Sequence, residues 1–465
     1  MTRSAGWCRC LALNVMRLPQ SKRSMPRILL FRVTVRTAFR WTKSLIRCAR
    51  PVRICKINIK RPRWVVWPST RSNVEGMVMN IPLLDLDRVE APIDKARGLS
   101  NPWYTHESCF ITERDTVFSN NWTCVAFTHD VPESGSVYPV NLMGIPLLVV
   151  RDREQCVRVF HNVCSHRGVQ LVDGAQKLSG MLCCPYHSWT YDLTGRLVAT
   201  PHVGGINTHQ VDGLDCAKHG LKAVRCHEWM GLIFVDLSGA LAPFESRIES
   251  LLARWDAWIP ERNYDDLEAD PAHGQLEIEL ACNWKLAVEN YCEAYHLPWV
   301  HPGLNTYSRL DDHYNIVDVN FSGQGSQAYR LAESEGFELP KISNWPQHAL
   351  QSAEYISLFP NVLLGVQADH AFAMIITPEA CDRTRERLML MYAPGVVDNP
   401  ASLTARNSIR SAWQEVFSED VAVVESMQRG RNSPAFDGGK FSPVMDPPTH
   451  AFHQWTATQI KKGEG

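Results

Sequence analysis

The chain has 465 residues, 45% of them hydrophobic, and a formal net charge of −1, so it can bury a large core and is typical of two domains. No apolar run approaches the roughly 18 residues that a membrane helix requires, so we expect no membrane-spanning segment. The 15 cysteines show no spacing typical of a disulfide framework, so we expect a protein of the reducing cytoplasm.

Residues 1–76 differ from the rest of the chain in charge. They contain 18 of the 48 Lys and Arg residues but a single acidic residue, Glu75, which gives a net charge of +17 against −18 for the remaining 389 residues. Three interpretations are open. The segment could be translated from a misplaced start, with the native protein beginning at Met77 or Met79, or it could be an organelle transit peptide, which would place the protein in an organelle matrix. It could also be a nucleic-acid-binding arm. We favour the misplaced start and rank nucleic-acid binding last, so we expect no nucleic-acid partner. This extension has no regular period, and we expect it to be disordered.

Residues 77–116 have helical character and are expected to pack as a lead-in on the C-terminal domain. From 117 to 238 the chain contains short β-rich runs separated by Gly, Pro and Asp turns. These runs include Val137–Val150, Cys156–Phe160 and Gly231–Val235. They predict a small β domain.

Two short motifs in this β-rich region combine cysteine with histidine. They are Cys164-Ser165-His166 and, after 17 intervening residues, Cys184-Pro185-Tyr186-His187. Two thiolates and two imidazoles can hold zinc, or a two-iron cluster that carries cysteines on one iron and histidines on the other. Zinc fingers usually group their cysteines first and their histidines second, whereas here each loop supplies one of each, which favours the iron–sulfur cluster. Only Cys184, and not the adjacent Cys183, leaves two residues before His187.

Residues 239–465 alternate predicted helices with predicted strands. The expected helices are 244–257, 284–296 and 408–428, and the expected strands are 275–280, 354–366, 370–377 and 386–393. This pattern predicts an α+β domain.

The predicted helix 284–296 carries the first candidates for a second metal site. It contains no proline or glycine, and Glu293 and His296 lie on one side of it, three residues apart. Pro298 should end the helix, so that the following turn folds His301 back beside His296. Two histidines five residues apart, with a carboxylate three residues before the first, predict a metal-binding nest.

The predicted helix near the C-terminus offers a third ligand. Its apolar residues at helical spacing are Ile409, Trp413, Val416, Val424 and Met427. Asp420 lies on this stripe, whereas Glu419 and Glu425 lie off it and are expected to be solvated. A buried aspartate needs a partner, which is either a buried arginine or a metal. The metal interpretation predicts a facial triad of His296, His301 and Asp420 around a ferrous ion with open positions.

The two sites together resemble those of the oxygenase (α) subunit of Rieske-type non-haem iron oxygenases. The resemblance covers about Trp103 to Met427 and rests on the segments 161–168, 184–189 and 283–302. It implies one Rieske [2Fe–2S] cluster and one mononuclear Fe(II). The implied cluster ligands are Cys164, His166, Cys184 and His187, and the implied iron ligands are His296, His301 and Asp420.

The resemblance also implies a fold and an assembly. The fold is α+β, with a small β-sandwich Rieske domain over 117–238 and a helix-grip (START-like) catalytic domain with an antiparallel sheet over 239–465. The assembly is a homotrimer with electron transfer between subunits, because the two metals of one chain lie too far apart. Glu293 would bridge His296 to the cluster ligand His187 of the partner subunit, so we name Glu293 and Asp420 as catalytic residues.

One departure from the family pattern concerns the substrate. Members that attack naphthalene-like substrates carry a Gly-Asp pair with an asparagine four residues before the aspartate, whereas this chain has Cys292-Glu293 with Asn290 three residues before the glutamate. This pattern is similar to a glutamate-bearing branch that includes carnitine and other quaternary-amine monooxygenases. We therefore expect hydroxylation or N-demethylation of a small quaternary or N-methylated amine or an aromatic compound. An aromatic-ring-hydroxylating dioxygenase α subunit is the alternative.

The implied reaction requires O2 and electrons. The chain has no glycine-rich dinucleotide turn and no flavin signature, so we expect NAD(P)H to act through a separate reductase or ferredoxin. Two other classes of function stay open, namely a Rieske electron carrier without an oxygenase site and a ligand-binding module without chemistry. Candidate pocket residues, each of which fits the core equally well, are Tyr307, His313, Tyr355 and Phe372.

Overall fold

The computed structural model describes residues 84–464, except 260–263, 265, 330–337 and 343–344. The predictions for residues 1–76, and the start sites considered at Met77 and Met79, lie outside these residues. Within the described ranges, none of the helices combines the length and the apolarity needed to cross a bilayer.

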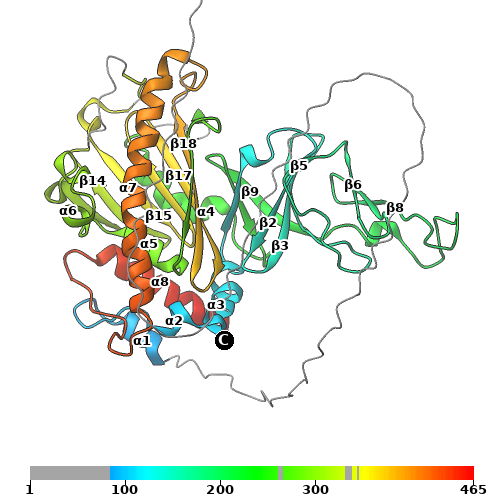
Figure 1. The fold of residues 1–465 in the computed structure, drawn as a ribbon, viewed down its shortest axis with the longest axis horizontal. Helices are drawn as coiled ribbons and strands as arrows, with labels where there is room; N and C mark the ends of the chain where they lie inside the picture. The colour runs from blue at the N-terminus through cyan, green and yellow to red at the C-terminus, as the bar shows by residue number, and fades with distance from the viewer. Residues whose placement is uncertain (1–83, 260–263, 265, 330–337, 343–344, 465) are drawn as a thin grey trace, which may run out of the picture. The chain divides into compact units, whose positions relative to one another are not determined.

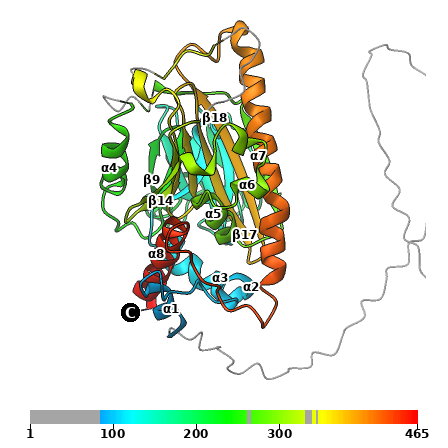
Figure 2. The same ribbon diagram turned by 90° about the vertical axis from the view of Figure 1, so that its left-hand side faces the viewer.

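Three short helices precede the first strand. They are α1 (Leu84–Glu90), α2 (Pro102–Thr105) and α3 (Glu107–Glu113). Figures 1 and 2 show them grouped with the C-terminal helix α8 (Pro447–Glu464) near one end of the long helix α7 (Leu403–Gly430). Leu86 and Val89 on α1 are fully buried, so apolar contacts hold this end of the chain in place.

The N-terminal β domain contains two antiparallel sheets. The larger has the strand order β1-β10-β9-β4-β3-β2-β5, and the smaller has the order β6-β7-β8. The bounds are β1 (Thr123–Phe127), β2 (Ser136–Leu142), β3 (Ile145–Arg151), β4 (Val157–His161), β5 (Gln176–Lys177), β6 (Met181–Cys183), β7 (Thr190–Asp192), β8 (Leu197–Ala199), β9 (Ala223–Trp229) and β10 (Leu232–Asp236). Side chains from both sheets share one apolar core, for example Leu148 and Phe160 with Leu182 and Tyr191, which makes the domain a small β-sandwich.

The β-rich run Val137–Val150 is a hairpin. Strands β2 and β3 pair antiparallel and are joined by Met143 and Gly144, whose φ angles are +50° and +91°. Positive φ at both loop residues is typical of the two-residue turns that match the twist of paired strands.

The C-terminal domain is built on an eight-stranded antiparallel sheet. Its order is β11-β18-β17-β16-β15-β14-β13, and β12 also pairs with β18. The bounds are β11 (Glu268–Ala269), β12 (Gln275–Leu280), β13 (His313–Val317), β14 (Phe321–Ser326), β15 (Ala353–Leu358), β16 (Val362–Val366), β17 (Ala371–Ala380) and β18 (Arg383–Tyr392). Together with the β-sandwich, this sheet confirms the predicted α+β class.

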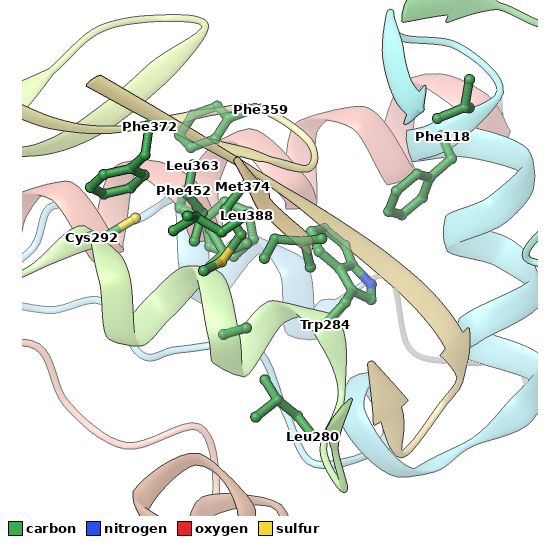
Figure 3. Packing of buried hydrophobic residues seen from close by; sticks show 14 of the residues in the cluster. Phe118, Leu280, Trp284, Cys292, Phe359, Leu363, Phe372, Met374, Leu388 and Phe452 are labelled. Carbon is green, nitrogen blue, oxygen red and sulfur yellow. The ribbon is translucent and has the colours of Figure 1, made fainter. Parts of the chain in front are cut away.

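Helices cover both faces of this sheet. Figure 2 shows α4 (Phe244–Trp255) on one face and α7 on the other. Alternation along β18 explains the two layers, because Met389 and Met391 belong to the core beneath α4, whereas Leu388 and Leu390 belong to the core beneath α7. Helix α5 (Trp284–Cys292) lies in this second core, and Figure 3 shows side chains of the sheet and of α8 gathered beside it.

The strand predicted over 354–366 is wrong as a single element. The chain forms β15, turns at Phe359–Asn361 and returns as β16, with Glu354 opposite Val366 in the register. The side chain of Asn361 fixes the turn by hydrogen bonding to the backbone of Cys124 and Ile376. Every residue of both strands is buried, so no alternation of polar and apolar residues marks the turn.

Candidate metal centres

The two loops that carry the Cys/His motifs have nearly the same backbone. In the first, the amide of Gly168 donates to the carbonyl of Cys164 at 3.0 Å, and in the second the amide of Ser188 donates to the carbonyl of Cys184 at 3.0 Å. Gly168 and Ser188 both take positive φ angles, +72° and +56°. Each loop therefore folds tightly around its own cysteine.

The four side chains form an inner pair and an outer pair. Cys164 and Cys184 are each 2% exposed, whereas His166 is exposed and His187 is half-buried. The two imidazole rings lie 4.8 Å apart, and His166 stacks on Trp189 at 4.6 Å. Two buried thiols behind two imidazoles fit a cluster with cysteines on the inner iron and histidines on the outer iron.

Two further observations fit metal binding by this set. The Nδ1 atom of His187 is buried and has no hydrogen-bond partner among the described residues, which is unusual for a polar atom unless another group binds it. Burial raises the pKa of the Cys184 thiol, so metal binding must displace its proton. Cys183 is exposed on β6, where its sulfur accepts a hydrogen bond from Thr190 at 3.7 Å, and it does not belong to the buried pair.

The structure brings His296, His301 and Asp420 together. One ligand atom of each lies within 4.8 Å of the other two. The Nε2 atom of His301 lies 3.1 Å from Oδ1 of Asp420, and the Nε2 atom of His296 lies 3.7 Å from the same oxygen. The described contacts of Asp420 are these imidazoles and the amide of Asn290 at 3.1 Å, and no arginine in the described part of the chain pairs with it. Two imidazoles and a carboxylate that converge in this way fit a two-histidine, one-carboxylate iron site.

The helix predicted to reach His296 ends four residues earlier, at Cys292. Glu293 is extended, with φ −127° and ψ 157°, and its carboxylate accepts hydrogen bonds from the backbone amides of Tyr295 and His296. These contacts stabilise a turn in place of another helical turn. A short helix α6 (Leu297–Val300) follows, flanked by His296 and His301, so Pro298 lies in its first turn and does not terminate the preceding helix.

Each histidine of the triad is held by a carboxylate. Glu293 lies 2.7 Å from Nδ1 of His296, and Glu419 lies 2.7 Å from Nδ1 of His301. Because a carboxylate accepts, each Nδ1 carries a proton, which leaves each Nε2 as the atom that could bind a metal.

The predicted solvation of Glu419 is wrong. Helix α7 runs beside the segment that carries His301, so the residue next to Asp420 on the helix reaches the far side of that imidazole. Glu425 is also not simply solvated, since it accepts a hydrogen bond from the amide of Ala281 at 3.1 Å. Burial alone would lower the pKa of His301, but hydrogen bonds to Asp420 and Glu419 raise it.

A cavity adjoins the triad. Its wall includes Tyr291 from α5, Tyr355 from β15, and Trp413 and Phe417 from α7. Of the candidate pocket residues, His313 and Tyr355 line the cavity. The other two are not among its lining residues: Tyr307 packs on Tyr329 at 6.1 Å and Phe372 packs on Trp413 at 4.6 Å between ring centres.

Trp413 is fixed by a hydrogen-bonded chain that sequence reasoning missed. Its indole Nε1–H donates to Nε2 of His370 at 2.9 Å, and Nδ1 of His370 lies 2.8 Å from Asp369. An indole can only donate, so Nε2 accepts and Nδ1 donates to the carboxylate. The only hint in the sequence is the Asp369-His370 pair beside a predicted strand.

Two family models match the chain in the order of the two sites. The Rieske [2Fe-2S] domain matches residues 121–210, and the ring hydroxylating alpha subunit (catalytic domain) matches residues 267–462. The first range contains the four Cys/His residues of the paired loops, and the second contains the triad.

Similar proteins include two oxygenase subunits. The carnitine monooxygenase oxygenase subunit of Escherichia coli (strain K12) is 26% identical over 339 residues, which cover 72% of this chain and 84% of that protein. The glycine betaine monooxygenase oxygenase subunit of Chromohalobacter salexigens is 27% identical over 394 residues, which cover 77% and 84%. A solved quaternary ammonium Rieske monooxygenase has the same fold, with a TM-score of 0.67 and 22% identity over 80% of this chain and 98% of that one.

Proposed function

This chain is the oxygenase (α) subunit of a Rieske-type non-haem iron oxygenase, and from this premise we propose that it uses O2 and electrons from a separate NAD(P)H-dependent reductase or ferredoxin to oxidise a small quaternary or N-methylated amine. Its Rieske domain and its ring-hydroxylating catalytic domain imply a Rieske cluster and a mononuclear iron. The convergence of His296, His301 and Asp420 beside an aromatic-walled cavity carries the proposal.

The proposed ligands follow from the two constellations. Cys164 and Cys184 bind one iron of the cluster, and His166 and His187 bind the other. His296, His301 and Asp420 bind the mononuclear Fe(II). We also keep the domain limits 77–116, 117–238 and 239–465 as part of the proposal.

The chemistry divides between the metals and the protein. When bound, the ferrous ion supplies the O2 chemistry, and the cluster supplies single electrons at a potential between about −150 and +300 mV. Glu293 and Glu419 orient the two imidazoles, and the apolar wall of the cavity keeps water from the reacting C–H bond.

The amine substrate is supported by the cavity wall and by the relatives. Tyr291, Tyr355 and Trp413 line one cavity, and cations with methyl groups are attracted to the faces of aromatic rings. The similar proteins are named for carnitine and glycine betaine, both quaternary ammonium compounds.

We further propose a homotrimer in which Glu293 links His296 to the cluster of the partner subunit. Two properties of Glu293 support this link between subunits. Its carboxylate contacts His296, and its side chain is 15% exposed, so part of it remains accessible to a partner. Oxygenase activity then depends on Glu293, and Glu293→Gln should keep both metals and lose turnover.

Metal content and oxygen uptake test the proposal together. Purified protein should contain about three irons and two acid-labile sulfides per chain, and Asp420→Ala should lose one iron and retain the cluster spectrum. With a surrogate reductase, methylated amines should stimulate O2 uptake, and the enzyme should release an oxidised product. A chain with only two irons would be an electron carrier, and uptake driven by arenes but not by amines would indicate an aromatic-ring dioxygenase.

A further inference from the structure

A second carboxylate lines the cavity beside the triad. Glu386 lies on β18, in register between Ile278 of β12 and Ile376 of β17, and it is 7% exposed. It shares the phase of Leu388 and Leu390, whose side chains belong to the core beneath α7. Glu386 and Asp420 are the two acidic residues among the described residues of the cavity wall.

Among the described residues, Glu386 differs from other buried carboxylates in having no countercharge. Glu113 is paired with Lys285 at 2.5 Å, and Glu354 is paired with Arg254 at 2.5 Å. No hydrogen-bond donor or cation in the described part of the chain contacts Glu386. An unpaired carboxylate in an apolar site is costly, and burial together with the nearby charge of Asp420 raises the pKa of Glu386 to about 8.

Because no described residue pairs with Glu386, a cation that enters the cavity would be its partner. A ferrous ion held by two neutral imidazoles and Asp420 keeps a net positive charge. A cationic substrate that enters beside it would be repelled unless another anion lines the same cavity. Glu386 is placed to be that anion, because the described part of the chain gives it no other partner and a bound cation beside it favours loss of its proton.

We propose that Glu386 determines specificity by providing the countercharge for a cationic head group in this cavity. The inference rests on the proposed function, and it names the residue that selects a charged amine over a neutral compound of the same shape. The aromatic wall favours the cation, but its apolar surface also binds a neutral tert-butyl group, so the wall alone gives only part of the selection. A buried carboxylate distinguishes the two by charge.

Two probes of equal shape test this inference. Choline carries a trimethylammonium group, and 3,3-dimethyl-1-butanol carries a neutral tert-butyl group in its place. Binding of each to the anaerobic, oxidised holoenzyme is measured by calorimetry, so that no turnover is needed. The wild type should bind choline at least about tenfold more tightly than the neutral alcohol.

Glu386→Gln removes the charge and keeps the shape of the side chain. It should weaken choline binding by about tenfold or more and leave binding of 3,3-dimethyl-1-butanol unchanged, whereas Glu386→Asp should retain part of the preference. Glu279→Gln is the matched control, because Glu279 is exposed on the neighbouring strand β12. The visible spectrum of the cluster verifies that each variant is folded and loaded.

The two proposals fail in different ways. If Glu386→Gln binds both probes as the wild type does, or if the wild type does not prefer choline, the role of Glu386 is wrong, even when methylated amines drive O2 uptake. If the wild type oxidises arenes and no methylated amine, the proposed function fails first, and the role of Glu386 falls with it.

Discussion

At the scale of single residues, the two histidines of the proposed iron site each contact a carboxylate, one from an earlier residue and one from a later residue of the chain. Glu293 lies three residues before His296, and Glu419 lies 118 residues after His301. The first contact could be predicted, because both residues belong to one local segment. The second could not, because it depends on where α6 places His301 relative to α7.

The Glu419 contact leads to a prediction about metal affinity. Glu419→Gln removes the negative charge that makes His301 a stronger ligand and fixes its ring, so iron affinity should fall by about 10-fold or more. Iron per chain after dialysis against a chelator measures the effect, and the visible spectrum should show an intact cluster. Glu415→Gln is the control, because Glu415 is exposed one turn earlier on α7. Equal iron retention in Glu419→Gln and in the control would contradict a role for Glu419.

Glu386 is an acidic residue in the buried phase of a strand, and such a position can be recognised in the sequence. Asp420 was identified because an acidic residue lies on an apolar helical stripe. Glu386 lies in the same phase as Leu388, Leu390 and Tyr392 on a strand, so the same argument applied with a period of two would have identified it. The sequence could not show that this carboxylate lacks a partner, since partners come from distant segments.

At the scale of elements, the start of helix α5 was easier to predict than its end. Helix α5 begins after Asn283, whose side chain accepts a hydrogen bond from the amide of Lys285 at 3.1 Å, which is a local capping signal. Its end at Cys292 depends on the side chain of Glu293 and on the amide of Gln324, which donates to the carbonyl of Glu293 at 3.1 Å. The first contact is local and the second is tertiary, so no pattern within the helix marked the boundary.

The division of residues 354–366 into two strands is a different case. Pro360 lies in the turn and is a local signal that should have divided the run. Continuous burial on both sides of the turn hid it, because an apolar run without alternation has no period to interrupt.

Helix α5 is also tied to the lead-in helices by a buried ion pair, which leads to a prediction about stability. Lys285 and Glu113 are both fully buried, and Nζ of Lys285 donates to Glu113 at 2.5 Å and to the carbonyl of Trp103 at 2.6 Å. Lys285→Met leaves the carboxylate buried and unpaired, so the free energy of unfolding should fall by about 3–5 kcal/mol. Denaturant unfolding followed by tryptophan fluorescence measures the loss.

The double variant Lys285→Met/Glu113→Gln tests the cause of that loss. It removes both charges and should recover most of the stability, because no uncompensated charge remains. Lys95→Met is the control for loss of a lysine at an exposed position. A double variant as unstable as Lys285→Met would show that packing, and not the unpaired carboxylate, causes the loss.

At the scale of the whole molecule, the sequence predicts two donor sets but not their relation in space. Cys164 and His166 are neighbours in one loop, and Cys184 and His187 are neighbours in another, so local spacing is enough to propose the cluster set. The iron set needed one long-range assumption, that Asp420 faces the core. Electron transfer from a cluster to the iron of its own chain or of a neighbouring chain depends on the assembly. No local sequence pattern predicts which of the two occurs.

Mixed assemblies test which iron each cluster serves. One variant, Cys184→Ser, lacks the cluster but keeps the triad, and a second, Asp420→Ala, keeps the cluster but lacks the iron. Each homotrimer should be inactive. We assume a ring in which electrons pass in one direction between neighbouring subunits. Random mixing then places a working cluster beside a working iron at about a quarter of the interfaces. Co-expressed variants should therefore recover about a quarter of wild-type O2 uptake. Native mass spectrometry verifies that mixed trimers form. Mixed trimers without activity would mean that electrons stay within one chain, and the bridging role of Glu293 between subunits would then be wrong.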